Sequence, residues 1–153
     1  MTQSKSTYFT YSTVHGPITI GADERGITHV AFDAQPLEGA NQASELTNRA
    51  ATQIQEYLAG KRIWFDVPLN PAGSAFQKEV WTEVAALPYG TSCSAAELAN
   101  ALGKAGAHRS IGTAIRRNPV PILIPTHRVD LPNTTGKTAK IFRALRAMEQ
   151  KNS

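Results

Sequence analysis

The segment Asn70-Pro71-Ala72-Gly73 divides the chain into two halves that differ in charge and in hydrophobic pattern. Proline and glycine interrupt regular structure, so a run of this kind is typical of a linker. Residues 1–73 carry 5 Lys+Arg and 7 Asp+Glu, whereas residues 74–153 carry 11 Lys+Arg and 5 Asp+Glu. A length of 153 residues suffices for one domain or two small ones. We therefore predict two domains, residues 1–70 and 74–153, and the basic second domain suits a polyanionic partner.

The first half is predicted to form a small antiparallel sheet with one helix. Three segments rich in strand-forming residues are separated by turn signals, which is typical of hairpin-connected strands: residues 8–14, 18–22 and 27–32. Residues 44–59 repeat apolar side chains at helical spacing and are followed by Gly60, a common helix stop. Residues 63–67 are expected to be extended. The first domain is therefore predicted to mix strands with a single helix.

The second half is predicted to be mostly helical. Ser74 can cap a first helix, because its hydroxyl can accept a hydrogen bond from a first-turn amide. Ser94 and Glu97 match the capping box, in which each side chain bonds to the backbone of the other, so a second helix is expected over residues 95–102. A third begins near Ala107, after a glycine-containing turn. The second and third helices form a candidate helix-turn-helix.

The third of these helices, over residues 108–118, is rich in small and cationic side chains. Gly112 costs about 1 kcal/mol relative to alanine in a helix interior, so close approach of a sugar-phosphate backbone is one interpretation of its presence. Because helix pairs with glycine turns are common, the pattern alone does not establish a DNA-binding element. The candidate DNA-contacting residues are Arg109, Ser110, Gly112, Thr113, Arg116, Arg117 and Asn118.

The segment Pro125-Thr126-His127-Arg128-Val129 carries the chemistry of the second half. It resembles the active-site segment of the 6-O-alkylguanine-DNA alkyltransferases, in which a cysteine between the proline and the histidine accepts the alkyl group. Residues 55–62, Gln-Glu-Tyr-Leu-Ala-Gly-Lys-Arg, also resemble a motif of that family. Further matches lie in the first predicted helix of the second half and in the turn after it, at Phe76, Gln77, Val80, Trp81, Pro88, Tyr89 and Gly90.

The resemblance spans nearly the whole chain and is strongest from Phe76 to Val129. It implies an α/β (α+β) fold with a small RNase-H-like antiparallel sheet domain, which is mainly a scaffold in that family. A mostly helical, winged-helix-like DNA-binding domain is expected to follow. The expected assembly is a monomer, and no metal or cofactor is implied.

The resemblance also implies roles for the residues around the segment. Thr126 stands at the position of the acceptor cysteine, and His127 and Glu149 match the pair that activates the thiol. Arg128 is expected to form an internal salt bridge. The pocket for the base is expected to include Ala95, Pro125, Thr126, His127 and Arg128.

In alkyltransferases the second helix of the pair binds the minor groove of DNA. An arginine at its start enters the base stack and holds the gap left when a nucleotide rotates out. Arg109 matches that arginine, and the alternative interpretation is a surface arginine that pairs with a phosphate. Asn118 matches the asparagine that closes the helix and supports the active-site turn, and its alternative is a helix C-cap.

Two departures from the family pattern concern the pocket. The tyrosine that approaches the base in that family is replaced here by Ala95. The glycine-rich loop after the active-site segment is replaced by residues 130–137, Asp-Leu-Pro-Asn-Thr-Thr-Gly-Lys. The alkyltransferase-like proteins, which bind alkylated DNA without repairing it, also lack the acceptor cysteine but generally keep this tyrosine. The chain therefore resembles a more divergent member of that group.

Alkyl transfer needs a strong nucleophile, and the Thr126 hydroxyl is not one. A thiolate can be made near neutral pH by a neighbouring histidine, whereas a threonine hydroxyl stays protonated. A one-step displacement also develops no oxyanion that a hydrolase-like site could stabilise. Cys93 is the only cysteine, which excludes an intrachain disulfide and is compatible with a reducing cytosol. We interpret Cys93 as a small structural residue before a helix rather than as a substitute nucleophile.

The predicted function is binding of double-stranded DNA, with or without 6-O-alkylguanine, by minor-groove helix insertion and nucleotide flipping without alkyl transfer. The protein would act in DNA repair in the cytoplasm, away from membranes, with downstream repair proteins as further partners. One alternative is a methylated-DNA–protein-cysteine methyltransferase that acts through Cys93 or is an acceptor mutant. Another is an interaction module that keeps the fold and does not bind DNA. The lesion recognised is left open.

Overall fold

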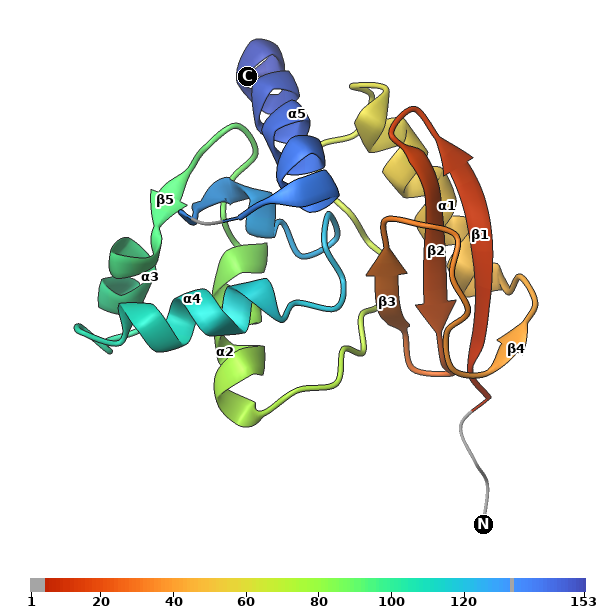
Figure 1. Cartoon of the computed structure of the whole chain (residues 1–153), viewed down its shortest axis with the longest axis horizontal. Coiled ribbons are helices and arrows are strands. Elements are labelled where there is room, and N and C mark those ends of the chain that lie inside the picture. The colour runs from red at the N-terminus through yellow and green to blue at the C-terminus, as the bar shows by residue number, and fades with distance from the viewer. Residues whose placement is uncertain (1–4, 133) are drawn as a thin grey trace. The chain divides into compact units, whose positions relative to one another are not determined.

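The computed structural model describes residues 5–132 and 134–153, which belong to two units. The first unit extends to Ala72, and the second spans Gly73–Ser153. The first contains strands β1 to β4 and helix α1, and the second contains helices α2 to α5 with two short strands, β5 and β6 (Figure 1). Within the described residues, no helix combines the length and the apolar character needed to cross a membrane.

The first unit is built on a four-stranded sheet with the strand order β3-β2-β1-β4. Strands β1 (Thr7–Thr13) and β2 (Gly16–Ala22) form an antiparallel hairpin, and β3 (Ile27–Ala31) pairs antiparallel with β2. These three strands are the ones that the turn signals predict. A two-residue strand that was not predicted, β4 (Ala40–Asn41), pairs in parallel with the outer edge of β1.

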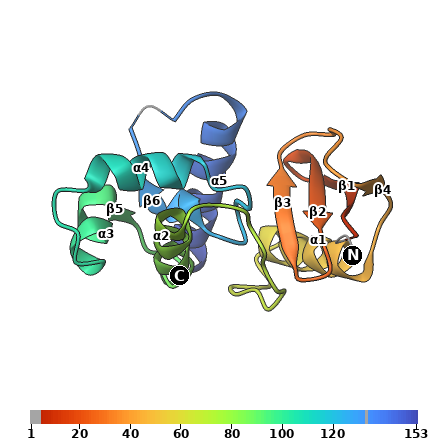
Figure 2. The ribbon, with the colours of Figure 1, turned by 90° about the horizontal axis from the view of Figure 1, so that it is seen from below.

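Helix α1 (Glu45–Leu58) packs against β1, β2 and β3 (Figure 2). Its N-terminus is a capping box, because the Ser44 hydroxyl accepts from the Thr47 amide at 3.1 Å and the Thr47 hydroxyl accepts from the Ser44 amide at 2.8 Å. The apolar face of the helix and the sheet form the core of this unit, which includes Ile18, Ile20, Ala22, Ile27, Val30, Ala50, Ile54 and Tyr57.

Residues 63–67, which the sequence predicts to be extended, do not join the sheet. The Asp66 carboxylate instead forms an ion pair with Arg49 at 3.0 Å and accepts a hydrogen bond from Gln53, and both partners lie on α1. The strand-like contact of this region is an isolated bridge between Ile27 and Leu69. Side chains from the helix therefore hold the segment, and this tertiary contact has no signature in the local sequence.

The second unit is mostly helical, as predicted. Its helices are α2 (Ala75–Ala85), α3 (Ala95–Ala101), α4 (His108–Arg116) and α5 (Gly136–Asn152). Capping boxes at Ser74 and Ser94 begin α2 and α3, and each serine hydroxyl accepts a backbone amide hydrogen bond at 3.1 Å. Helix α4 ends at Arg116, two residues before the predicted end.

The core of the second unit joins α2 to α4. The Trp81 indole on α2 is buried and donates to the carbonyl of Ala114 on α4 at 2.8 Å. Strands β5 (Cys93–Ser94) and β6 (Val129–Asp130) form a short parallel pair that fixes the start of α3 beside the end of the Pro-Thr-His-Arg-Val segment. The surrounding buried side chains include Val80, Val84, Leu98, Ile111, Ile115, Val120 and Leu145.

Candidate functional site

Asn118 organises the turn that leads from α4 to Thr126. Its side-chain amide donates to the Ile124 carbonyl at 3.1 Å and to the Thr126 hydroxyl at 3.2 Å, and its oxygen accepts from the Val120 amide at 2.9 Å. Within the turn, Ile122 has a φ of 74°, a left-handed conformation that strains a β-branched residue. Asn118 thus lies beyond the helix and bonds to the protein, and its amide fixes the position of the Thr126 hydroxyl.

Thr126 begins a short 3-10 helix, Thr126–Arg128, and is 2% exposed. Its hydroxyl accepts from Asn118 and keeps one proton to donate. The side chain at this position can therefore form hydrogen bonds to a bound group, but a protonated hydroxyl is a poor nucleophile.

A buried network joins the next two residues to Glu149 on α5. The Glu149 carboxylate lies 2.6 Å from Nε2 of His127 and accepts from Nε and Nη2 of Arg128 at 2.8 and 3.0 Å. It also accepts from the Gly90 amide at 3.0 Å, and Arg128 donates to the Leu87 carbonyl. Because an ionised carboxylate only accepts, Nε2 of His127 carries the proton. The network therefore ties α5 to the 3-10 helix and to the turn after α2.

The imidazole of His127 is held neutral by its surroundings. Burial lowers the pKa of His127 from its usual value of 6.5, and this effect exceeds the opposing influence of the Glu149 carboxylate. Folding therefore favours the neutral imidazole, and this preference contributes stability at pH values above the pKa of the histidine in the unfolded chain. The contribution is lost as the pH falls from the pKa of the unfolded chain to the lower pKa of the folded protein. Arg128 and Glu149 form an ion pair beside the neutral ring.

The depressed pKa of His127 predicts a distinct titration. In an NMR pH titration, the side-chain resonances of His127 should report protonation only below 6.5, the usual pKa of a histidine side chain, because burial lowers the pKa of this ring. The His127→Gln variant identifies the resonance. Protonation of His127 at or above its usual pKa of 6.5 would contradict a desolvated, neutral ring.

A cavity of about 240 Å³ lies beside Thr126 and His127. Helix α5 and the segment after the 3-10 helix contribute the other lining residues, which are Val129, Leu131, Thr134, Ala139, Phe142, Arg143 and Arg146. The tilted contact between the rings of His127 and Phe142, with centroids 6.0 Å apart, forms part of its wall. The cavity thus combines apolar walls with two threonine side chains, a neutral imidazole and two guanidinium groups.

The lining of this cavity differs from the pocket that the sequence predicts. Thr126 and His127 line it, as expected, but Ala95, Pro125 and Arg128 are not among its lining residues. Arg128 turns inward to Glu149 and Leu87 and stacks over Tyr89 with 5.6 Å between Cζ and the ring centroid. The contribution of α5 was missed, although the spacing of Arg143 and Arg146 at i and i+3 was available as a signal.

Helix α4 presents only some of its predicted DNA-contacting residues to solvent. Five are exposed, namely Arg109, Ser110, Thr113, Arg116 and Arg117. Gly112 is buried, and a Cβ added there would meet Arg116 and Leu131 at 3.5 and 3.8 Å, which are ordinary contact distances. A close contact within the described residues therefore does not explain the glycine, and its approach to a DNA backbone stays a prediction.

Arg116 is exposed but has a partner within the protein. Its Nη2 donates to the Pro132 carbonyl at 2.8 Å, so it links α4 to the segment that contains the cavity residues Leu131 and Thr134. Arg117, which lies directly after α4, makes no side-chain hydrogen bond or ion pair among those found in the described part of the chain. The two adjacent arginines therefore differ in their surroundings.

Cys93 is half-buried in β5, and burial is the main cause that raises the pKa of its thiol. The carboxylates of Glu97 and Asp130 act in the same direction. A raised pKa leaves less thiolate at neutral pH, so Cys93 has the character of a structural thiol rather than of an activated nucleophile.

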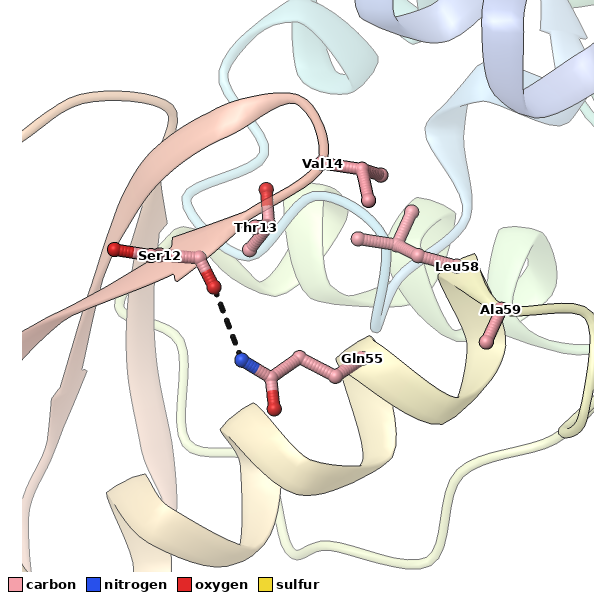
Figure 3. A pocket seen from close by; sticks show the side chains of 6 residues that line it. All are labelled: Ser12, Thr13, Val14, Gln55, Leu58 and Ala59. Atoms are coloured by element: carbon pink, nitrogen blue, oxygen red, sulfur yellow. Dashed lines mark hydrogen bonds between the residues drawn. The ribbon is translucent and has the colours of Figure 1, made fainter.

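A second cavity, of about 400 Å³, belongs to the first unit. It lies between the β1–β2 hairpin and the end of α1 and is lined by Ser12, Thr13, Val14, Gln55, Leu58 and Ala59 (Figure 3). Gln55 donates to the Ser12 carbonyl at 3.0 Å across it. None of these lining residues ionises near neutral pH, so the cavity offers no acid, base or nucleophile for a reaction.

The arrangement defines a two-unit α+β protein with an exposed cationic helix next to a buried Thr-His-Arg turn. Residues 7–71 match the model of the ribonuclease-like domain of 6-O-methylguanine DNA methyltransferase, and residues 75–150 match the model of the DNA-binding domain of that protein. The chain belongs to the 6-O-methylguanine-DNA methyltransferase family. The predicted family and the predicted fold class are thereby confirmed.

Individual relatives match the sequence or the structure of this chain over most of their own length. The methylated-DNA–protein-cysteine methyltransferase of Methanosarcina barkeri is 38% identical over 123 residues, which cover 74% of this chain and 75% of the relative. The constitutive enzyme of the same name from Bacillus subtilis is 35% identical, with 80% and 79% covered. The crystal structure of Mycobacterium tuberculosis OGT in complex with DNA superposes with a TM-score of 0.86 at 30% identity, covering 96% of this chain and 94% of that one.

Proposed function

We propose that this protein binds double-stranded DNA, rotates a nucleotide into the cavity beside Thr126, and recognises 6-O-alkylguanine without accepting the alkyl group. One observation carries the proposal: the buried side chain of Thr126, which lines the cavity and directly precedes His127 of the His127–Glu149 pair, is a hydroxyl and not a thiol. Family membership supplies the DNA partner, and the chemistry of Thr126 argues against transfer.

The exposed cations of the second unit support DNA binding. Arg109, Arg116 and Arg117 lie on or directly after α4, within the residues that match the DNA-binding domain of the family. Cations facing a duplex release counterions from its phosphates, so the affinity should fall steeply as salt is raised. The DNA-bound relative makes DNA the natural partner to test.

The proposed role of Arg109 is to hold the gap in the base stack after a nucleotide has rotated out. Arg109 is in the first turn of α4 and is exposed, so its side chain can reach beyond the helix. A wedge stabilises the rotated-out state in addition to the encounter. Arg109 should therefore matter most for duplexes in which a base leaves the stack easily.

Arg109→Ala should weaken binding to a duplex that contains 6-O-methylguanine about tenfold more than binding to the unmodified duplex. Arg117→Ala is the matched control, because this arginine is on the same exposed region and has the character of a phosphate contact. It should weaken both duplexes equally and lower the slope of log affinity against log salt by about one. Arg116 is a poorer control, because its bond to Pro132 also supports the cavity wall.

Fluorescence anisotropy on the two duplexes at several salt concentrations makes this measurement. If Arg109→Ala lowered the affinity for both duplexes equally, Arg109 would act only as a phosphate contact. A lack of binding to either duplex at low salt would favour an interaction module that does not bind DNA.

The intact mass of the protein should stay unchanged after incubation with excess alkylated duplex, and a gain of one alkyl group would contradict the non-catalytic function.

A further inference from the structure

Two arginines give the cavity beside Thr126 positive charge that recognition of an alkylated base does not by itself require. Arg143 and Arg146 both line it from α5, on the same helix as Phe142. Arg143 is exposed, and the Arg146 side chain is 31% exposed. Because both guanidinium groups keep access to water, they can remain charged without a buried counterion.

The groups that face these arginines leave a surplus of positive charge. None of the cavity-lining residues is acidic. Asp130 on β6 pairs with Arg146 at 2.6 Å, but its side chain is 54% exposed, so the pair is open to solvent and to competition. The nearby carboxylate of Glu149 is paired with Arg128, and the His127 ring adds no charge at neutral pH.

The remainder of the lining suits a flat base. Val129, Leu131, Ala139 and Phe142 provide apolar contacts, which are the usual walls of a small-molecule site. Thr126, Arg143 and Arg146 line the same cavity, so the substituent of a base bound between these walls could reach both the hydroxyl and the guanidinium groups. Thr126 can donate a hydrogen bond to the substituent while it accepts one from Asn118.

We propose that this cavity selects guanine whose 6-O substituent ends in a carboxylate. Arg143 is the main binding group, and Arg146 assists when it exchanges Asp130 for the ligand. Guanidinium pairs with carboxylate through two parallel hydrogen bonds, a geometry that neither a methyl group nor a neutral amide reproduces. The inference rests on the proposed function, because it requires a nucleotide to rotate into this cavity.

A DNA phosphate is the other source of an anion for these arginines. A phosphate contact would be present on every duplex, whereas a carboxylate contact depends on the adduct. The experiment therefore uses an unmodified duplex and three duplexes of the same sequence that contain 6-O-methylguanine, 6-O-carboxymethylguanine or 6-O-carbamoylmethylguanine. The last two have nearly the same shape and differ by one negative charge.

At fixed ionic strength the protein should bind the carboxymethyl duplex about tenfold more tightly than the carbamoylmethyl duplex, because a charge-assisted hydrogen bond is stronger than a neutral one. The Arg143→Gln variant should bind the carboxymethyl and carbamoylmethyl duplexes equally. Lys140→Gln, on the exposed side of the same helix and outside the cavity lining, is the matched control and should leave the ratio unchanged. Asp130→Asn should raise the ratio, because it frees Arg146 from its partner.

Three results would overturn the inference. Equal affinity for the carboxymethyl and carbamoylmethyl duplexes, with both bound better than unmodified DNA, would remove the carboxylate preference and leave the proposed function standing. An equal loss on all three duplexes for Arg143→Gln would make Arg143 a phosphate contact. Equal affinity for modified and unmodified duplexes would overturn the inference and lesion recognition together. The melting temperature of each variant verifies that it remains folded.

Discussion

Replacing Glu149 by alanine is expected to lower the free energy of unfolding of the second unit by about 3–5 kcal/mol. The Glu149 side chain is 2% exposed and accepts from Arg128, His127 and the Gly90 amide. The substitution leaves the guanidinium of Arg128, whose side chain is 6% exposed, buried without its counterion. A charge that has lost its partner in the interior costs far more than the salt bridge itself contributes.

Glu79→Ala is the matched control for this prediction. Glu79 belongs to the same unit and also faces a cation, Lys104 at 3.7 Å, but its side chain is 49% exposed. An exposed ion pair contributes at most about 1 kcal/mol, so this variant should unfold almost as the parent does. Urea unfolding can be followed by the fluorescence of Trp81, which is buried in the second unit, with Trp64 of the first unit replaced by phenylalanine. Similar losses for both glutamates would show that the buried network is not the main source of stability.

If the proposed non-catalytic function holds, Thr126→Cys is expected to produce a slow, single-turnover alkyl acceptor. In the reaction the sulfur forms a bond to the alkyl carbon, the bond from that carbon to the guanine oxygen breaks, and the oxygen keeps the electron pair. The new thiol would lie beside His127 and the Glu149 pair, and the Asn118 amide could donate to a thiolate as it donates to the hydroxyl.

The restored transfer should be weak for two physical reasons. Position 126 is 2% exposed, and burial disfavours the thiolate. Ala95 supplies no tyrosine to approach the base, and the cavity residues Leu131 and Thr134 come from a segment that replaces the glycine-rich loop of the family. The position of the base in the cavity should therefore be less favourable for in-line attack. Transfer at a full family-like rate would show that these two replacements matter little.

Mass spectrometry after incubation with a 6-O-methylguanine duplex measures this gain of function. The expected result is one added methyl group on residue 126 of Thr126→Cys. Thr126→Ser, which changes the side chain without adding a thiol, should remain unmodified. The double variant Thr126→Cys/His127→Gln should react more slowly than Thr126→Cys if the imidazole assists removal of the thiol proton.

Local patterns in the sequence predict much of the fold. Ser94 and Glu97 stand three residues apart, and their reciprocal bonds begin α3 where the capping-box pattern indicates. The turn signals separate β1, β2 and β3 as expected, because hairpins are made by neighbouring residues. Strand β4 could not be predicted, since two residues carry no periodicity and pair with β1 through a tertiary contact.

The candidate site could be predicted only in part. The Pro-Thr-His-Arg-Val segment is contiguous, so a motif reveals it. The predicted pocket residues and the residues that line the cavity agree only at Thr126 and His127, because the direction of a side chain depends on partners elsewhere in the chain. Arg128 turns toward Glu149, which is 21 residues away, and leaves the cavity wall to residues of α5.

Residue identities and spacings were sufficient to establish the order of the main elements, the family and the presence of a hydroxyl where the family has a thiol. These depend on residue identity and on spacings of a few residues, which local periodicity and capping make visible. The tertiary structure alone decided that Gly112 is packed inside the unit, that Arg116 bonds to Pro132, and that two arginines of α5 share the cavity with Thr126. Such contacts join residues that are distant along the chain, so only packing brings them together.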